Sequence, residues 1–305
     1  MNNPIISVVG LGKMGLGIYN RLSNKGIKSY GFDSGWEEED YKKNKVNGAS
    51  NLDDLIKLFS PNSKKVVWVM VPSGEATIST LNDLRSIMHD GDIIIDGGNS
   101  YYKESVEKYH FLKERNISLL DSGTSGGVWG EKDGYCLMVG GDKGSFDYCE
   151  QIFSALSSDG KGYGYMGPSG SGHFVKMIHN GIEYGMMQSM AEGIEILNQK
   201  KEFELDLVKI TSLWQHGSVV RSWLLDLLKE ALEENPDLDG IAPYVEDSGE
   251  GRWTIQEAID LDVPAHSITS SLFSRFYSRN NDSFGFKVLS SLRNQFGGHK
   301  IKKSN

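Results

Sequence analysis

The 305-residue sequence has few of the features that mark secreted, membrane or metal-binding proteins. It contains only two cysteines, Cys136 and Cys149, and neither belongs to a cluster with metal-ligand spacing. The two thiols favour a reducing compartment. No apolar run approaches membrane-spanning length, and residues 1–10 lack the basic stretch and long apolar region of a signal peptide. These absences predict a cytoplasmic protein with neither a membrane segment nor a bound metal.

The sequence also lacks an excess of basic residues. Its formal net charge is -9 at pH 7, from 32 Lys and Arg against 41 Asp and Glu. A surface of this charge repels nucleic acid and anionic membranes, so neither is an expected partner. An anionic ligand would have to be held by a local basic pocket.

Glycine is abundant, with 36 residues, and its clusters separate short apolar runs in the first half of the chain. These runs predict strands at residues 5–9, 28–32, 66–71, 93–95, 118–120 and 137–139, with helical spacing between them. Such alternation is typical of a parallel sheet with crossover helices. From about residue 173 helical periods dominate, at 173–198, 204–215, 219–233, 254–261, 268–278 and 284–295. We therefore predict a doubly wound, Rossmann-type α/β domain over residues 1–167 and an all-α domain over 168–305.

A Gly-rich turn, Gly10-Leu11-Gly12-Lys13-Met14-Gly15, directly follows the first predicted strand and opens a helical segment. Glycines at these positions let backbone N–H groups at a helix start approach a pyrophosphate. The second predicted strand ends in Asp33, about 20 residues further on, where an acid commonly binds the ribose hydroxyls. The turn therefore predicts a dinucleotide site, and a purely structural turn is the alternative.

Asp33 also bears on which dinucleotide is used. Its negative charge would repel the 2′-phosphate of NADP, and no Arg follows nearby to offset that charge. NAD is therefore the predicted cofactor, with NADP as the alternative.

Five polar side chains share one face of the helix predicted at 173–198. Lys176, His179, Asn180, Glu183 and Tyr184 fall at positions i, i+3, i+4, i+7 and i+8. Much of the remaining surface of this helix is apolar, so the polar face is expected to line a cavity. A solvated face is the alternative, but such faces usually carry Glu, Lys and Gln.

Two polar loops follow predicted strands, Asp-Gly-Gly-Asn-Ser at 96–100 and Asp-Ser-Gly-Thr-Ser-Gly-Gly at 121–127. Open α/β sheets bind ligands at these strand ends, and paired glycines offer backbone donors suited to a carboxylate. Either loop alone is also explained by an ordinary strand-to-helix turn. Together they favour the lining of a substrate site.

These motifs resemble those of the 6-phosphogluconate dehydrogenase family. The resemblance is carried by the Gly-rich turn, by 96–100, by Ser125-Gly126-Gly127 and above all by Gly-His-Phe-Val-Lys-Met-Ile-His-Asn-Gly-Ile-Glu-Tyr at 172–184. The length resembles that of the short form of the family. The resemblance implies oxidative decarboxylation of 6-phosphogluconate to ribulose 5-phosphate and CO₂ with reduction of NAD(P), in the pentose phosphate pathway or gluconate metabolism.

The resemblance also implies which residues form the site. For the substrate these are Ser125, Gly126, Gly127 and His179 at the carboxylate end, Asn99 and Asn180 at the hydroxyls, and Tyr184 and Arg275 at the phosphate. For the cofactor they are Gly10, Leu11, Gly12, Lys13, Met14, Gly15, Asp33, Val71 and Asn99. Arg293 and His299 belong to a tail motif that reaches the phosphate of a neighbouring subunit, which implies a homodimer or homotetramer.

One segment departs from the long form of the family, in which a Lys and a Thr near this point contact phosphate. This chain has Ser248 and Glu250 there, and an ionised Glu cannot donate a hydrogen bond. We expect the basic pocket to come instead from Arg275, Arg293 and His299, with Arg252 as a further candidate.

Lys176 and Glu183 are expected to carry the proton transfers. Removing a hydroxyl proton while hydride leaves the same carbon requires a base near neutrality, and a Lys partly buried beside a cationic ring can serve. The ketone formed lies β to the carboxylate, so loss of CO₂ gives an enediol whose oxygen protonated Lys176 stabilises without a metal. Glu183, two helical turns along, would protonate the carbon that lost CO₂.

Two other functions stay open at the level of sequence. A related β-hydroxyacid dehydrogenase, such as one acting on 3-hydroxyisobutyrate, would share the Gly-rich turn, the Ser-Gly-Gly loop and the Lys, but would not need His179, Glu183 or Tyr184. A non-catalytic NAD-binding regulator would need no proton relay, so Lys176 and Glu183 argue against it.

Overall fold

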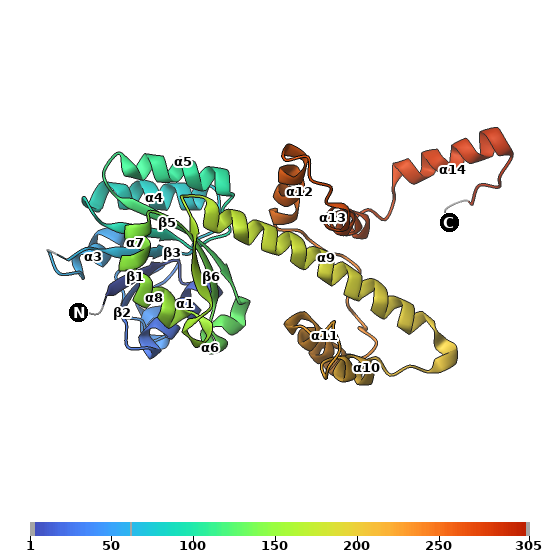
Figure 1. The fold of residues 1–305 in the computed structure, drawn as a ribbon, viewed down its shortest axis with the longest axis horizontal. Helices are drawn as coiled ribbons and strands as arrows, with labels where there is room; N and C mark the ends of the chain where they lie inside the picture. Colours follow the sequence, from blue (N-terminus) through green and yellow to red (C-terminus); the bar gives the residue numbers. More distant parts are fainter. Residues whose placement is uncertain (1–3, 62, 303–305) are drawn as a thin grey trace. The chain divides into compact units, whose positions relative to one another are not determined.

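A computed structural model of the chain describes residues 4–61 and 63–302. The chain divides into two compact units, Met1–His179 and Asn180–Asn305. The predicted fold class is confirmed, with a doubly wound sheet in the first unit and helices in the second (Figure 1). In the described part of the chain, no helix is both long and apolar enough to cross a membrane.

Among its described residues, the first unit is built on a seven-stranded sheet with the order β2-β1-β3-β4-β5-β6-β7. Its strands are β1 (Ile5–Val9), β2 (Lys28–Phe32), β3 (Val66–Val69), β4 (Ile93–Asp96), β5 (Ser118–Ser125), β6 (Cys136–Gly141) and β7 (Tyr163–Gly167). β1 pairs in parallel with β2 on one side and with β3 on the other. The strand order therefore switches at β1, because β2 is added on one side of it and β3 on the other. Open α/β sheets bind ligands beside the carboxyl ends of the strands at such a switch point.

Helices cover both faces of the sheet, because successive residues of a strand point to opposite sides. On β4, Ile93 and Ile95 belong to one buried cluster and Ile94 to the other. The first cluster includes side chains of α1 (Lys13–Asn24) and α8 (Glu150–Leu156), and the second includes those of α4 (Glu75–Ile87) and α5 (Tyr102–Lys113). Figure 1 shows these two pairs of helices on opposite sides of the strands. The helices of this unit are α1 (Lys13–Asn24), α2 (Glu38–Lys43), α3 (Leu52–Lys57), α4 (Glu75–Ile87), α5 (Tyr102–Lys113), α6 (Gly130–Asp133), α7 (Lys143–Tyr148) and α8 (Glu150–Leu156).

One strand pair differs from the predicted parallel arrangement. β6 runs antiparallel to β5, with Asp121 opposite Gly140 and Ser125 opposite Cys136. The connection between them, residues 126–135, is shorter than the crossover of about a dozen or more residues that a parallel pair needs. β7 is a further strand, within a glycine-rich stretch that the sequence does not mark as one.

α9 (Ser171–Gln199) begins in the first unit and ends in the second. Beyond it, the described residues form helices and no strand, as predicted. α12 begins at Glu250 rather than at 254, because its first turn, Glu-Gly-Arg-Trp, lacks the repeated apolar spacing from which a helix is predicted, although Glu250 and Gly251 are buried. The helices after α9 are α10 (Leu207–Trp214), α11 (Trp223–Glu234), α12 (Glu250–Asp260), α13 (His266–Ser278) and α14 (Phe284–Gly297).

Candidate active site

The Gly-rich turn directly follows β1, and the N–H of its first glycine donates to the carbonyl oxygen of Phe32 at the end of β2 at 2.8 Å. Gly10 has a left-handed backbone with φ of +91°, and a Cβ there would lie 2.5 Å from the carbonyl oxygen of Met70, so only glycine fits. At Gly12 a Cβ would meet nothing within 4 Å, so this part of the turn faces open space. α1 starts at Lys13, which places its first N–H groups at the turn. The turn therefore fits a dinucleotide pyrophosphate.

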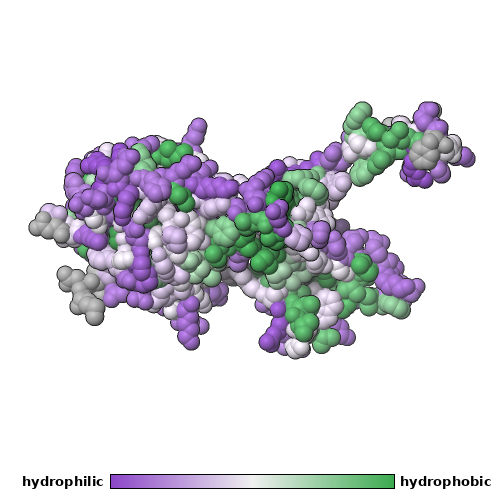
Figure 2. Space-filling view, turned by 45° about the horizontal axis from the view of Figure 1, so that its top comes forward, coloured by the Kyte–Doolittle hydropathy of each residue, from purple (hydrophilic) through white to green (hydrophobic). Residues whose placement is uncertain are grey.

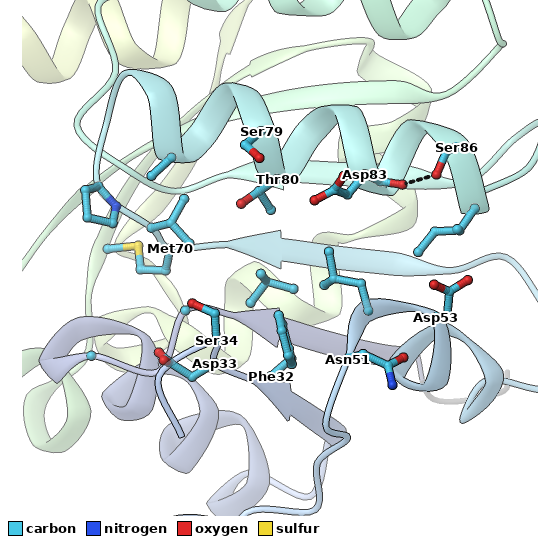
Figure 3. A pocket seen from close by; sticks show the side chains of 18 residues that line it. Phe32, Asp33, Ser34, Asn51, Asp53, Met70, Ser79, Thr80, Asp83 and Ser86 are labelled. Atoms are coloured by element: carbon cyan, nitrogen blue, oxygen red, sulfur yellow. Dashed lines mark hydrogen bonds between the residues drawn. The ribbon is translucent and has the colours of Figure 1, made fainter. Parts of the chain in front are cut away.

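A cavity of about 720 Å³ opens beside this turn (Figure 3). The predicted cofactor residues Gly10, Gly12, Asp33 and Val71 line it. Figure 3 shows Thr80 and Asp83 of α4 on one side of the cavity and Asp33 and Ser34 on the other. The part of the wall that α4 contributes was not predicted from the sequence. The sequence feature that could have indicated it is a row of small and polar residues at helical spacing, Ala76, Ser79, Thr80, Asp83 and Ser86.

Other predicted cofactor residues are not among the described residues that line the cavity. These are Leu11, Lys13, Met14, Gly15 and Asn99. Leu11 contributes through its backbone, because its N–H donates to Asp33 at 2.6 Å. Asn99 is exposed in the loop after β4. The contacts of these five residues with a cofactor stay predictions.

Asp33 is held by two backbone hydrogen bonds. The N–H of Leu11 donates to Oδ2 at 2.6 Å and that of Gly35 to Oδ1 at 2.9 Å. These bonds place a carboxylate at the end of β2, beside the Gly-rich turn. The described wall of the cavity also includes Asp53 and Asp83, and it includes neither Lys nor Arg. It therefore offers no cation to balance a 2′-phosphate.

Lys176 is buried against β5, with 8% of its surface exposed. A Cβ at Gly123 of β5 would lie 2.3 Å from the Cβ of Lys176, so the absence of a side chain at Gly123 lets α9 pack directly on the strand. β5 ends at Ser125, and Gly126 and Gly127 follow with left-handed φ of 128° and 52°. One strand thus supports the candidate base and leads into the Ser-Gly-Gly loop.

Asp121 of β5 caps the start of α9. Its Oδ1 accepts the N–H of Gly170 at 2.7 Å and its Oδ2 that of His173 at 2.9 Å. Burial raises the pKa of the Asp121 carboxyl, and His173 and these backbone N–H groups oppose the rise. The His173 ring is in turn 2.7 Å from the Ser105 hydroxyl through Nδ1. Asp121 anchors the helix that carries Lys176, a role that was not predicted from the sequence.

Gly123→Ala is expected to lower kcat about 100-fold, because α9 must move away from β5 and a displacement of about 1 Å at a catalytic group can cost that much. The KM for NAD should change little, since Gly123 is not among the described residues that line the cofactor cavity. Steady-state kinetics measure both values. The matched control is Gly144→Ala in α7, where a Cβ would meet nothing within 4 Å. Equal kcat values for the two variants would refute the packing argument.

In the second unit, Tyr184 and Arg275 lie together. The guanidinium carbon of Arg275 is 3.6 Å from the centroid of the Tyr184 ring, a cation–π contact. Arg275 also donates from Nη1 to the carbonyl oxygen of Glu246 at 2.7 Å. The Tyr184 hydroxyl accepts the N–H of Ser248 at 3.2 Å. The two predicted phosphate contacts are thus brought together beside the loop that precedes α12.

Glu250 is buried beside them, with 2% of its surface exposed. Its Oε1 accepts from Nδ2 of Asn180 at 3.2 Å, and its Oε2 accepts from the Ser248 hydroxyl at 2.5 Å. Both carboxylate oxygens therefore contact protein groups.

The remaining basic candidates differ in their surroundings. Nε of Arg252 is 2.6 Å from Oδ2 of Asp247, which also pairs with Arg279 through Oδ1 at 2.8 Å. The hydrogen bond from Arg252, together with that from Arg279, lowers the pKa of Asp247. Arg293 and His299 are both exposed and line one cavity of about 470 Å³.

His179 and Glu183 are half-buried on α9. α9 is one continuous helix, so the seven-residue step from Lys176 to Glu183 spans two turns. Within residues 4–61 and 63–302, no group of three or more His, Cys, Asp or Glu side chains is placed to hold a metal ion.

Two family models match nearly the whole chain. The NAD binding domain of 6-phosphogluconate dehydrogenase matches residues 5–167, and the 6-phosphogluconate dehydrogenase C-terminal domain matches residues 172–300. This chain belongs to the 6-phosphogluconate dehydrogenase family. Membership confirms the resemblance carried by the Gly-rich turn and by residues 172–184.

Members of the family differ in length and in the cofactor that they are named for. The NAD(+)-dependent, decarboxylating 6-phosphogluconate dehydrogenase of Haloferax volcanii is 38% identical over 300 residues, which cover 98% of each chain. The NADP(+)-dependent enzyme of Bacillus subtilis is 33% identical over 293 residues, which cover 91% of this chain and 62% of that protein.

A solved 6-phosphogluconate dehydrogenase has the same fold over nearly the whole chain. The Plasmodium falciparum enzyme, determined in its apo form, with NADP+ and with 6-phosphogluconate, superposes with a TM-score of 0.82 at 28% identity. The match covers 99% of this chain and 66% of that one. This chain thus has the length of the shorter members of the family.

Proposed function

We propose that this chain oxidises and decarboxylates 6-phosphogluconate to ribulose 5-phosphate and CO₂, with NAD preferred over NADP. Family membership supports the reaction. The observation that carries the proposal for the residues of this chain is the burial of Lys176 against Gly123, on the strand that leads into the Ser-Gly-Gly loop. That strand aligns a candidate base with a loop suited to a carboxylate.

Bound NAD supplies the hydride acceptor. Neutral Lys176 removes the proton of the substrate hydroxyl as hydride leaves the same carbon. When CO₂ departs, the electrons of the broken C–C bond form the C=C bond of the enediol and the carbonyl π electrons move to the ketone oxygen, to which protonated Lys176 gives a proton. Protonated Glu183 then donates to the carbon that lost CO₂, while Lys176 takes back the enediol proton. The ketose results, and a proton returned from Lys176 to Glu183 restores both groups.

We assign the substrate contacts along the same lines. Ser125, Gly126, Gly127 and His179 would hold the carboxylate, Asn99 and Asn180 the hydroxyls, and Tyr184 and Arg275 the phosphate. The packing of Arg275 on Tyr184 supports the last pair, since a guanidinium has five N–H donors and the hydrogen bond to Glu246 uses one.

The acidic wall of the cofactor cavity supports the preference for NAD. Asp33 is fixed by the Leu11 and Gly35 N–H groups, so it cannot turn away from a 2′-phosphate without breaking two hydrogen bonds. Asp53 and Asp83 add to the negative charge around it. A 2′-phosphate would meet like charge, whereas the free hydroxyls of NAD can donate to a carboxylate.

We further propose a homodimer or homotetramer in the cytoplasm, with Arg293 and His299 contributed across subunits. Apolar side chains lie exposed over the helices of the second unit, as Figure 2 shows. On α14 they include Phe284, Phe286 and Leu289, with 78%, 57% and 56% of their surfaces exposed. Exposed apolar surface of this kind favours burial against a second copy. Cys136 and Cys149 are unpaired thiols, which suits a reducing compartment.

The proposal is tested by assaying the purified chain with 6-phosphogluconate, gluconate and 3-hydroxyisobutyrate, each with NAD and with NADP, while CO₂ release is followed. We expect turnover of 6-phosphogluconate with equimolar CO₂. We also expect kcat/KM to be at least about tenfold higher with NAD, a difference of about 1.4 kcal/mol. A strong NADP preference would refute the charge argument. Turnover of 3-hydroxyisobutyrate without CO₂ would indicate the simpler dehydrogenase, and NAD binding without any turnover a regulator.

A further inference from the structure

Glu250 is a buried carboxylate that the proposed proton transfers do not use. It lies in the first turn of α12 with 2% of its surface exposed. Burying a carboxylate is costly unless hydrogen bonds replace its water, and here Asn180 and Ser248 supply them. Asn180 is a proposed substrate contact, and Ser248 bonds to another one, Tyr184. Glu250 therefore connects two residues that we assign to the substrate.

An ionised carboxylate only accepts hydrogen bonds, so it fixes the direction of the bonds around it. Asn180 must turn its NH₂ group toward Glu250, so its amide oxygen, which only accepts hydrogen bonds, faces a different direction. Ser248 must give its hydroxyl proton to Glu250. The Ser248 oxygen can then only accept, and its neighbour is the Tyr184 hydroxyl at 3.4 Å.

Tyr184 is consequently oriented as a donor. Its oxygen accepts the N–H of Ser248 at 3.2 Å, and its own proton faces Ser248 Oγ across 3.4 Å. That second distance is long for an O–H···O hydrogen bond, so a phosphate oxygen can replace Ser248 at little cost. Without the carboxylate, Ser248 would be able to turn its proton toward Tyr184 instead.

We propose that Glu250 is a positioning residue that sets the hydrogen-bond polarity of the substrate site. It makes Asn180 an acceptor for a sugar hydroxyl and Tyr184 a donor to the phosphate. The inference rests on the proposed function and deepens it, because it assigns a role in substrate binding to a buried carboxylate that the proposed proton transfers do not use. Glu250 thus favours phosphate binding without touching the phosphate.

Glu250→Gln tests the inference, since glutamine keeps the size of the side chain but brings a donor. Its NH₂ group must face either Ser248 or Asn180, and one of the two partners must then reverse. We expect the KM for 6-phosphogluconate to rise about 10- to 100-fold, as for the loss of one hydrogen bond to a charged group. The value of kcat should stay within about threefold and the KM for NAD unchanged, because Lys176 and the cofactor cavity are untouched.

Two further variants separate polarity from shape. Glu250→Asp is smaller but still only accepts hydrogen bonds, so its KM should lie closer to that of the wild type than the KM of Glu250→Gln does. Tyr184→Phe removes the proton that Glu250 is inferred to direct, so in the double variant Glu250→Gln should add less than it does alone. Thr211→Val, which removes another buried hydrogen bond of the second unit, is the control for lost stability and should leave KM unchanged.

Three results would overturn the inference. The first is a wild-type KM in folded Glu250→Gln, and the second is a KM closer to wild type in the Gln than in the Asp variant. The third is that the effects of Glu250→Gln and Tyr184→Phe on KM multiply fully in the double variant. Melting temperatures show which variants are folded. If Glu250→Gln does not fold, Glu250→Asp is compared with Thr211→Val, and an effect of Glu250→Asp on KM that is the same with and without Tyr184→Phe refutes the link. Turnover of 6-phosphogluconate by the wild type tests the proposed function separately, and its absence would remove both proposals.

Discussion

Lys176→Met is expected to fold, bind NAD and lose turnover about 10²- to 10⁴-fold, the range typical for removal of a general base. Methionine resembles the aliphatic part of lysine in length, so it can fill the space of this side chain, of which only 8% of the surface is exposed. What is lost is the amine that takes the hydroxyl proton and later protonates the ketone oxygen. NADH formation measures kcat, and calorimetry measures NAD binding.

The control for Lys176→Met is Lys161→Met, at an exposed lysine of the first unit. It removes one lysine in the same way and should leave kcat unaltered. Near-normal turnover of Lys176→Met would remove Lys176 from the role of base, whatever the behaviour of the control. Loss of NAD binding together with turnover would point to a disturbed fold instead, which the melting temperature would reveal.

Glu183→Gln is expected to bind NADH normally but to form ribulose 5-phosphate about 10²- to 10⁴-fold more slowly. Glutamine preserves the size of the side chain and cannot supply the proton that the carbon needs after CO₂ departs. Lys176 remains in place, so hydride transfer should still occur in the first turnover. Rapid mixing with detection of NADH, followed by quantification of ribulose 5-phosphate, distinguishes the two stages.

Glu192→Gln on the same helix is the matched control, because Glu192 is exposed and bonds to Gln188 within α9. It should form product at the wild-type rate. Ribulose 5-phosphate production at that rate by Glu183→Gln would exclude Glu183 as the acid. An equal loss in both variants would indicate an effect on α9 as a whole.

Several parts of this site could be predicted because their signals are local in the chain. The turn from Gly10 to Gly15 follows an apolar strand directly, and Asp33 ends the next one, so spacing alone indicates a dinucleotide site. Lys176 and Glu183 lie on a single helix, whose period can be read from residues 173–198. The small and polar residues of α4 that line the cofactor cavity also lie close together in the sequence. They were not predicted to bind the cofactor, because no motif distinguishes them from an ordinary helix face.

Other parts had no local signal. Asp121 of β5 caps α9 by accepting the N–H of His173, which lies 52 residues further along the chain. Nothing in the sequence distinguishes Gly123 from the other glycines near it, because its role depends on Lys176, which packs against it in the fold. The antiparallel direction of β6 follows from the length of β5, which extends to Ser125 rather than ending at residue 120 and so leaves a connection too short for a parallel crossover.

For Lys176, the sequence by itself determined that the residue lies on a helix and that His179, Asn180, Glu183 and Tyr184 share its face. The reason is that helical periodicity is a property of a short segment of chain. Only the tertiary structure decided what buries it and what anchors its helix, namely Gly123 and Asp121. The same division holds at Glu250. The sequence indicates only that an ionised Glu250 cannot donate a hydrogen bond to a phosphate, whereas in the fold its two oxygens accept hydrogen bonds from Asn180 and Ser248. The physical reason is that hydrogen-bond partners and close packing depend on residues far apart in the chain, which folding alone brings together.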